Sequence, residues 1–214
     1  MEIRQLSQLD KLLIGANNAL RTVAAPAGRP HRENPAEKIA DVELDAAQRA
    51  HAAGLMRVNH AGEVAAQALY SGQAVMARTE ATRAHLLEAA AEEEDHLAWC
   101  AARIDELGGR RSALDPIWYG GSFLLGMLAG AAGDERSLGF IAETEDQVEA
   151  HISDHLSRLP KGDSKSRAIL DKMAADEAHH GTTARLQGGT DLPQPVRLLM
   201  AFGGEILRRT ALRL

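Results

Sequence analysis

Along most of the chain, apolar residues recur three or four positions apart, which is the spacing of one face of an α-helix. Most of these residues are Ala and Leu, which favour helices. Glycine pairs and prolines interrupt the pattern, as at Gly108-Gly109, Pro160 and Gly188-Gly189. We therefore predict an all-α protein with six main helices, over residues 42–78, 81–107, 117–131, 134–158, 164–187 and 194–210.

The first forty residues differ from the rest of the chain. Leucines recur at helical spacing between Leu6 and Leu13, which predicts a short amphipathic helix. Asp10 and Lys11 break the apolar run, so this stretch does not have the form of a secretory signal. Three prolines between Pro26 and Pro35 then indicate a linker. We expect an N-terminal helix and Pro-rich linker over 1–40, and the main domain over 41–214.

Composition narrows the range of folds and partners. The 214 residues are 45 % hydrophobic but only 3 % aromatic, with 39 Ala and 27 Leu, which excludes an all-β domain. The net charge of −6 argues against nucleic acid as the main partner, because phosphate binding needs a basic surface. A single cysteine excludes an intramolecular disulfide framework and a metal site built only from thiolates.

Two segments have the composition of lipid-facing helices. Residues 116–133 carry no charge and are rich in glycine, although they are slightly short for a membrane span. They fit either a buried connecting helix or a segment lying against a bilayer. Residues 194–210 place Leu, Phe and Ile among arginines, as interfacial helices do. We expect helices 117–131 and 194–210 to face a membrane.

The strongest chemical signal is a duplicated pattern of carboxylates and histidines. Glu93–His96 and Glu177–His180 are Glu-x-x-His units, whose two side chains lie on one face of a helix. Glu63 precedes the first unit by 30 residues (93 − 63), and Glu145 precedes the second by 32 (177 − 145). A Glu on one helix and a Glu-x-x-His on the next, given twice, is the ligand set of a di-metal carboxylate centre in a four-helix bundle. These ligands suit iron and manganese equally.

Neighbouring polar residues offer competing assignments. Asp176–His179 has the same spacing, but Glu177–His180 matches the register of the first unit better. We expect Glu92 and Glu94 to face solvent, and His151 to be a hydrogen-bonding partner that orients a ligand. Five further histidines fit ordinary polar positions: His51, His60, His85, His155 and His179.

Four segments resemble the demethoxyubiquinone hydroxylase family. They are RVNHAGEVAAQALYSGQ (57–73), EEEDHL (92–97), AETEDQVEAHI (142–152) and ADEAHH (175–180), in the order and spacing of that family's metal-binding segments. The first forty residues resemble the bacterial branch. Position by position, the resemblance implies six ligands to two iron ions: Glu63, Glu93, His96, Glu145, Glu177 and His180.

The resemblance also implies a fold and an activity. The expected fold is a ferritin-like four-helix bundle with a short hydrophobic crossover helix and amphipathic terminal helices. The expected reaction is hydroxylation of the ring of 2-polyprenyl-3-methyl-6-methoxy-1,4-benzoquinol by O₂ in ubiquinone synthesis. We would then expect the protein on the cytoplasmic face of the bacterial cell membrane, in contact with other enzymes of that synthesis.

Two other functions fit parts of the pattern. A ferritin-like iron-storage or peroxide-scavenging protein explains the ligands but not the apolar and basic helices. A membrane-bound quinone-binding scaffold with vestigial ligands explains the helices but not the complete ligand set. The sequence has no GxGxxG fingerprint for a dinucleotide or flavin. The electrons for a hydroxylation would therefore come from outside the chain or through the quinol, which in this family can be reduced by a nicotinamide.

Overall fold

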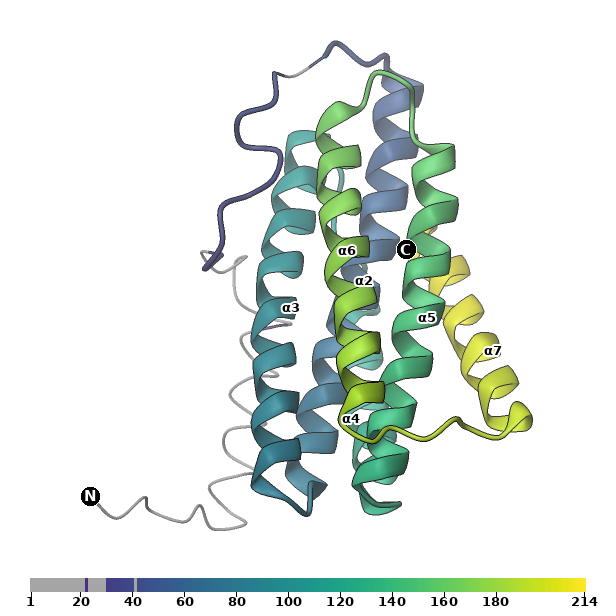
Figure 1. Cartoon of the computed structure of the whole chain (residues 1–214). Helices are drawn as coiled ribbons and strands as arrows, with labels where there is room; N and C mark the ends of the chain where they lie inside the picture. Colours follow the sequence, from purple (N-terminus) through teal and green to yellow (C-terminus); the bar gives the residue numbers. More distant parts are fainter. Residues whose placement is uncertain (1–21, 23–29, 41) are drawn as a thin grey trace.

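In the computed structural model, four long helices stand side by side and two further helices pack on their outside (Figure 1). The structure describes residues 22, 30–40 and 42–214, and this part of the chain contains no β-strand. The helix predicted between Leu6 and Leu13 lies outside it. The main helices are α2 (Ala46–Met76), α3 (Glu80–Glu106), α4 (Asp115–Ala131), α5 (Asp134–Arg158), α6 (Ser164–Leu186) and α7 (Gln194–Ala211).

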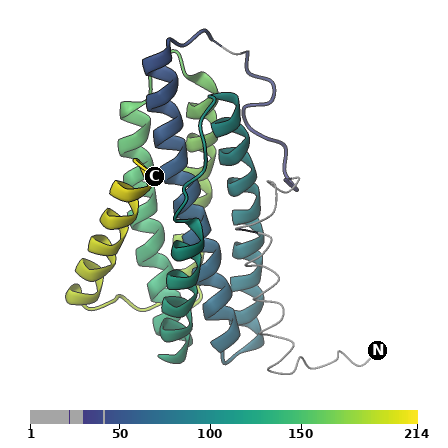
Figure 2. The same cartoon turned by 180° about the vertical axis from the view of Figure 1, so that it is seen from behind.

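The bundle consists of α2, α3, α5 and α6, with α2 packed against α3 and α5 against α6. Helix α4 connects the two pairs and lies along the outside of α2, as the view from behind shows (Figure 2). This long crossover lets α5 run in the same direction as α3. Helix α7 contacts α2 and α5 from outside. The prediction of an all-α, ferritin-like four-helix bundle with a crossover helix is confirmed.

Local hydrogen bonds explain where the helices begin. Helix α2 starts at Ala46, four residues later than predicted, because Asp45 caps it. The Asp45 carboxylate accepts the Gln48 N–H at 2.8 Å, and the Gln48 side chain accepts the Asp45 N–H at 3.0 Å. Helix α6 starts after Asp163, which accepts the Ser166 N–H at 3.0 Å and an Arg103 guanidinium N–H at 2.8 Å. These caps fix the helix ends that the apolar pattern leaves open.

The apolar core is divided into two parts along the bundle. One part surrounds Trp99, Leu55 and Met173, towards the end where α2 begins. The other surrounds Tyr70, Leu86 and Ile141, towards the end where α3 begins. Both parts take residues from all four bundle helices. Each part excludes water from one side of the polar layer that lies between them.

Helix α4 approaches α2 more closely than ordinary side chains allow. A Cβ atom on Gly72 would lie 2.2 Å from the Phe123 carbonyl oxygen, and one on Gly126 would lie 2.2 Å from that of Leu69. Glycine is therefore required on both helices at this contact. Gly126 and Gly130 thus serve helix packing on one face of α4, whereas nothing lies near Gly120 and Gly121.

The outer faces of α4 and α7 are strongly apolar. Among the described residues of α7 only Ala211 is buried. Large apolar side chains are exposed on both helices: Ile117, Leu124, Leu125 and Leu128 on α4, and Leu198, Leu199, Phe202 and Ile206 on α7. None of the helices in the described residues has both the length and the apolar character needed to span a membrane.

Candidate metal centre

Six polar side chains meet in the middle of the bundle, between the two parts of the apolar core. We call them the carboxylate–histidine cluster: Glu63 from α2, Glu93 and His96 from α3, Glu145 from α5, and Glu177 and His180 from α6. All six residues are at most 4 % exposed. Ionisable groups are rarely buried without a partner. The structure thus brings together every residue that the sequence pattern had selected as a metal ligand.

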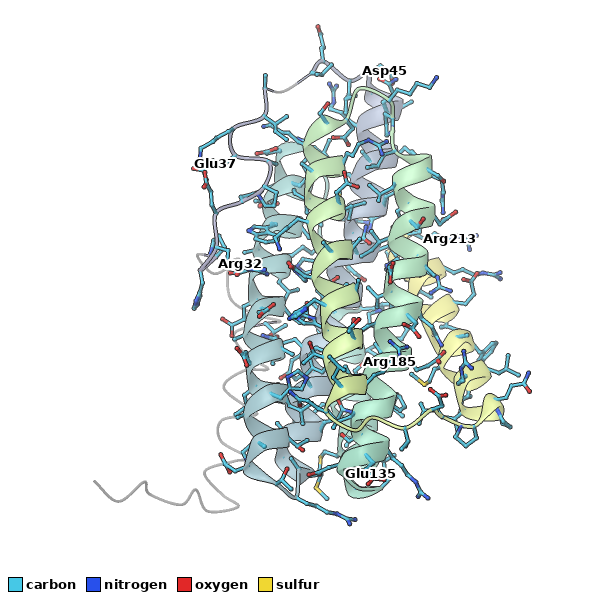
Figure 3. All side chains as sticks on the ribbon, viewed as in Figure 1. Arg32, Glu37, Asp45, Glu135, Arg185 and Arg213 are labelled. Atoms are coloured by element: carbon cyan, nitrogen blue, oxygen red, sulfur yellow. The ribbon has the colours of Figure 1, made fainter. Side chains whose placement is uncertain are left out.

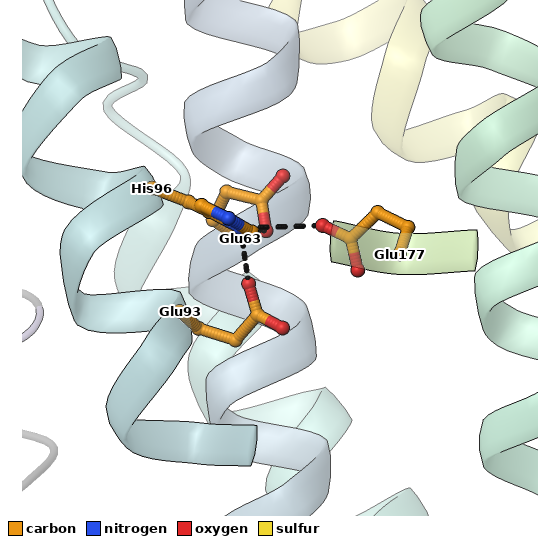
Figure 4. A group of neighbouring side chains, drawn as sticks. All are labelled: Glu63, Glu93, His96 and Glu177. Carbon is orange, nitrogen blue, oxygen red and sulfur yellow. Dashed lines mark hydrogen bonds and ion pairs between the residues drawn. The ribbon is translucent and has the colours of Figure 1, made fainter. Parts of the chain in front are cut away.

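Three members of the cluster surround a fourth, His96 (Figure 4). The Nδ1 atom of His96 lies 2.7 Å from Glu93 Oε2, 3.2 Å from Glu177 Oε1 and 3.8 Å from Glu63 Oε2. Three carboxylates and one imidazole therefore face a single point. A group with this many hard oxygen donors and one nitrogen suits a divalent first-row metal ion.

A second group forms around His180. Its Nδ1 atom lies 3.4 Å from Glu177 Oε2 and 3.4 Å from Glu93 Oε1. One ligand atom each from Glu145, Glu177 and His180 lie within 4.8 Å of one another. Glu177 belongs to both groups, and Glu93 contacts both histidines. The geometry is therefore that of two adjacent sites that share carboxylates.

Each histidine of the cluster is held at its other nitrogen by an acid from the opposite helix. His96 Nε2 lies 3.0 Å from Asp176 Oδ2, and His180 Nε2 lies 3.0 Å from Glu92 Oε2. This contact fixes the ring so that Nδ1 faces the site, as in carboxylate–histidine–metal arrangements. Glu92, expected to face solvent, is 38 % exposed, but its carboxylate also contacts His180. The sequence carried a signal for both acids, since each immediately precedes a Glu-x-x-His unit.

His151, which the sequence predicts to orient a ligand, contacts Asn59 and His155. His151 Nε2 lies 3.2 Å from Asn59 Oδ1, and its ring packs against His155 at 5.2 Å between centroids. Burial and the charge of Arg208 lower the pKa of His151 to about 4. Burial and His151 lower that of His155 to about 3. Both rings are therefore neutral components of the packing between α2 and α5.

The other histidines also have structural surroundings. His60 Nδ1 lies 3.4 Å from Asp115 Oδ2, where α4 begins on α2. His51 Nε2 lies 3.0 Å from the Arg158 carbonyl oxygen. His179 is exposed, whereas its neighbour His180 is buried. Burial lowers the pKa of His85.

The electrostatics of the cluster reflect the concentration of negative charge. Burial and the charge of Glu177 raise the pKa values of Glu63 and Glu145 well above the ordinary value. Burial opposes charge on His180, yet Glu177 and Glu93 raise its pKa to about 12. Without other cations, the cluster therefore retains protons to reduce its charge. A metal ion that displaced these protons would supply the same compensation.

Unpaired oxygen atoms show that the cluster fits metal ions. Both carboxylate oxygens of Glu145 and Oε1 of Glu63 are buried and accept no hydrogen bond from the described residues. Oε1 of Glu177, Oε1 of Glu93 and Nδ1 of His180 are also buried without a hydrogen bond and have only ion-pair contacts, at 3.2–3.4 Å. Buried polar atoms without partners are costly, at about 1–3 kcal/mol each. Four carboxylates would balance two divalent ions.

Comparison with known proteins agrees with this reading of the site. Residues 50–207 match the family described as ubiquinone biosynthesis protein COQ7. The chain is 55 % identical to the 3-demethoxyubiquinol 3-hydroxylase of Xanthomonas axonopodis pv. citri over 210 residues, which are 97 % of this chain and 95 % of the relative. It is 54 % identical to the enzyme of that name from Nitrosomonas europaea, over 95 % of this chain and 97 % of the relative.

A third relative with the same name, from Cupriavidus metallidurans, is 53 % identical over 96 % of this chain and 100 % of its own length. These matches extend over nearly the whole chain, so they include all four helices that carry the carboxylate–histidine cluster. The chain belongs to the ubiquinone biosynthesis protein COQ7 family.

Proposed function

We propose that this protein is a 3-demethoxyubiquinol 3-hydroxylase, a monooxygenase that uses two iron ions and O₂ to hydroxylate the ring of a polyprenyl benzoquinol in ubiquinone synthesis. The observation that carries the proposal is the carboxylate–histidine cluster, in which four carboxylates and two imidazoles from four helices are buried together. The names of the relatives supply the reaction and the substrate class.

The six members of the cluster would hold the two ions, with Glu177 and Glu93 placed to contact both. When bound, iron would supply open coordination positions for O₂ and would pass on to it the two electrons that an external reductant or the quinol provides. The chain supplies the rest of the site. Asp176 and Glu92 fix the two imidazoles, and the apolar residues on both sides exclude bulk water.

We further propose that α4 and α7 lie in the surface of a membrane, on its cytoplasmic side. A polyprenyl quinol resides in the bilayer, so its enzyme must reach it there. Exposed apolar residues line α4 from Ile117 to Leu128 and α7 from Leu198 to Ile206. The side chain of Arg209 is 75 % exposed beside this apolar face, as in helices that bind anionic lipid surfaces. Arg197 pairs with Glu143, and Arg208 and Arg209 pair with Glu205.

The activity is tested by extracting quinones from a strain that lacks this protein. We expect demethoxyubiquinone to accumulate, and the wild-type gene to restore ubiquinone. Glu177→Ala should not restore it, because Glu177 belongs to both groups of the cluster. Glu149→Ala, which changes an exposed carboxylate on α5, serves as the matched control and should restore ubiquinone fully. A normal quinone profile in the deletion strain would contradict the proposal.

Metal content and membrane binding are tested separately. Purified protein should contain about two iron ions per chain, as the two groups of ligands imply. A wholly soluble protein that assembles into cages and takes up many more ions would instead indicate iron storage. Vesicle flotation with the purified protein tests the contact of α4 and α7 with lipid.

A further inference from the structure

A segment ahead of the bundle reaches the candidate metal centre from outside. Residues 30–40 run along the outer side of α3 (Figure 1), and Figure 3 labels Arg32 in this segment. They lie outside residues 50–207, the part that matches the family. The side chain of Arg32 is only about one-third exposed. The segment is therefore attached to the bundle by a partly buried cation.

Arg32 joins the two helices that carry the Glu-x-x-His units. Its Nε atom donates to Asp95 Oδ2 on α3 at 2.7 Å, and its Nη1 atom donates to Asp176 Oδ2 on α6 at 2.8 Å. The guanidinium carbon lies 4.9 Å from the centre of the Trp99 ring. A planar fork of donors holds two carboxylates in a fixed arrangement, which the flexible ammonium group of lysine does less well.

Asp176, which accepts from Arg32, also contacts a member of the carboxylate–histidine cluster. The same Oδ2 atom that accepts from Arg32 lies 3.0 Å from His96 Nε2. The other Asp176 oxygen contacts Lys172, whose side chain is 44 % exposed and lies on the same helix. Arg32 is therefore the cation that fixes Asp176 from outside α6. His96 also packs against Trp99, at 5.4 Å between ring centres.

Asp95 fixes the position of the segment that carries Arg32. Its side chain is only 3 % exposed and also accepts the backbone N–H of His31 at 2.6 Å. The segment is thus bound to α3 through both a backbone and a side-chain donor. Charge-assisted hydrogen bonds of this kind are among the stronger ones in proteins. Arg32 cannot move away from Asp176 without breaking these contacts.

We propose that Arg32 is a positioning residue for the metal centre. By holding Asp176 between α6 and α3, it fixes the ring of His96, so that the segment before the bundle completes the site. This inference rests on the proposed function, because it requires a metal ion at the cluster. It assigns a role in the site to a residue outside the bundle.

The test measures the affinity for Co²⁺ and the visible spectrum of the Co²⁺-loaded protein, in competition with a chelator. Asp176→Asn should weaken binding about 10- to 100-fold, the usual effect of removing a group that orients a ligand. Arg32 acts one contact further out, so Arg32→Met should weaken it about 5- to 10-fold. The spectrum should change as well, because the ring of His96 is less constrained.

Two comparisons separate positioning from general stabilisation. Arg185→Met is the matched control, since it removes an ion pair with Asp146 at the surface between α6 and α5. It should leave affinity and spectrum unchanged. In the Asp176→Asn background, Arg32→Met should weaken binding no further, because its effect passes through Asp176. Arg32→Lys should bind Co²⁺ more tightly than Arg32→Met does. If Arg32→Met does not fold, Arg32→Lys takes its place in these comparisons.

Each outcome bears on the inference. Wild-type binding of two ions together with unchanged affinity and spectrum in Arg32→Met would overturn this inference alone. Fully additive effects of Arg32→Met and Asp176→Asn would overturn it too, since Arg32 would then act by another route. A wild-type protein that bound no Co²⁺ and no iron would overturn the proposed function as well.

Discussion

The centre of the bundle buries charged side chains and the outer helices expose apolar ones, which is the reverse of the usual arrangement. In the centre, four carboxylates are at most 2 % exposed, whereas on α4 and α7 the leucines Leu128 and Leu199 are 69 % and 70 % exposed. A soluble protein normally buries leucine and exposes glutamate. Both features destabilise the isolated chain, and the metal ions and the membrane contact that we propose would each compensate for one of them.

The two regions differ in how precisely they are built. In the centre, each cluster histidine has an acid at its Nε2 atom and carboxylates at Nδ1. The outer faces of α4 and α7 carry exposed apolar side chains instead, and the polar contacts of α7 are separate ion pairs such as Arg197–Glu143 and Arg208–Glu205. Metal binding depends on exact ligand positions, while burial of apolar area does not depend on direction. Single substitutions should therefore have large effects in the centre and graded effects outside.

The largest effect is expected for Glu145→Gln. Glu145 is buried with both oxygens unpaired, so its replacement removes a ligand of the second group without changing the side-chain volume. We expect hydroxylation to fall at least 100-fold, about the upper limit for groups that only orient a ligand. Steady-state assays and iron analysis provide the measurement. Glu149→Gln, one helical turn further along α5 and exposed, should keep full activity, and equal losses in both variants would contradict the assignment.

Removal of the metal should be the next largest effect. A ligand present at about 1,000 times its Kd stabilises the folded state by about 4 kcal/mol. For a chain of this length this corresponds to a change in Tm of about 8–16 °C. We therefore expect a chelator of ferrous iron to lower the Tm of the loaded protein by this amount. Glu177→Ala should show no response to the chelator, and a wild-type Tm that ignores it would contradict metal binding.

Most of the carboxylate–histidine cluster can be predicted from the sequence, because the spacing of residues within one helix decides which of them share a face. Glu93 and His96 lie on one face whatever surrounds the helix, and the distances to Glu63 and Glu145 repeat. The partners of the imidazoles were not visible in the same way. Whether Asp176 reaches His96 depends on the rotation of α6 relative to α3, which no spacing within one helix determines. The contact of Arg32 was even less predictable from the sequence, because a segment outside the helices brings this residue to α3.

Helix α4 shows the same limit to prediction from the sequence. The sequence displayed its glycines and its lack of charge, but both a buried connector and a lipid-facing helix fitted that pattern. In the structure, Gly126 and Gly130 pack on α2, while Leu124, Leu125 and Leu128 are exposed on the other face of α4. Which face packs is decided by the partner helix, and Gly72 on α2 is half of that contact.

Substitution at the glycine contact tests whether α4 is held by backbone packing. Gly126→Ala would place a methyl group 2.2 Å from the Leu69 carbonyl oxygen. We expect a loss of about 1–3 kcal/mol in the free energy of unfolding, as for other overpacked contacts. Gly120→Ala is the matched control, because nothing lies within 4 Å of its added atom. It should stabilise slightly, through the better helix propensity of alanine. Equal unfolding curves for the two variants would contradict the close contact.

The smallest of these effects is expected on the outer face of α7. Leu199 is exposed and lies on the surface that we assign to lipid, so Leu199→Ser should weaken binding to anionic vesicles. Burial of one leucine side chain contributes about 1.5–3 kcal/mol, so the expected loss is about 10-fold or somewhat more.

Leu87→Ser is the matched control, since Leu87 is an exposed leucine on α3, away from α4 and α7. Iron content should stay constant in both variants, because neither residue belongs to the carboxylate–histidine cluster. If vesicle flotation fell equally for both, the apolar face of α7 would have no special part in binding lipid. If it fell only for Leu199→Ser, the exposed leucines of α7 would have a lipid partner, just as the buried carboxylates would have a metal one.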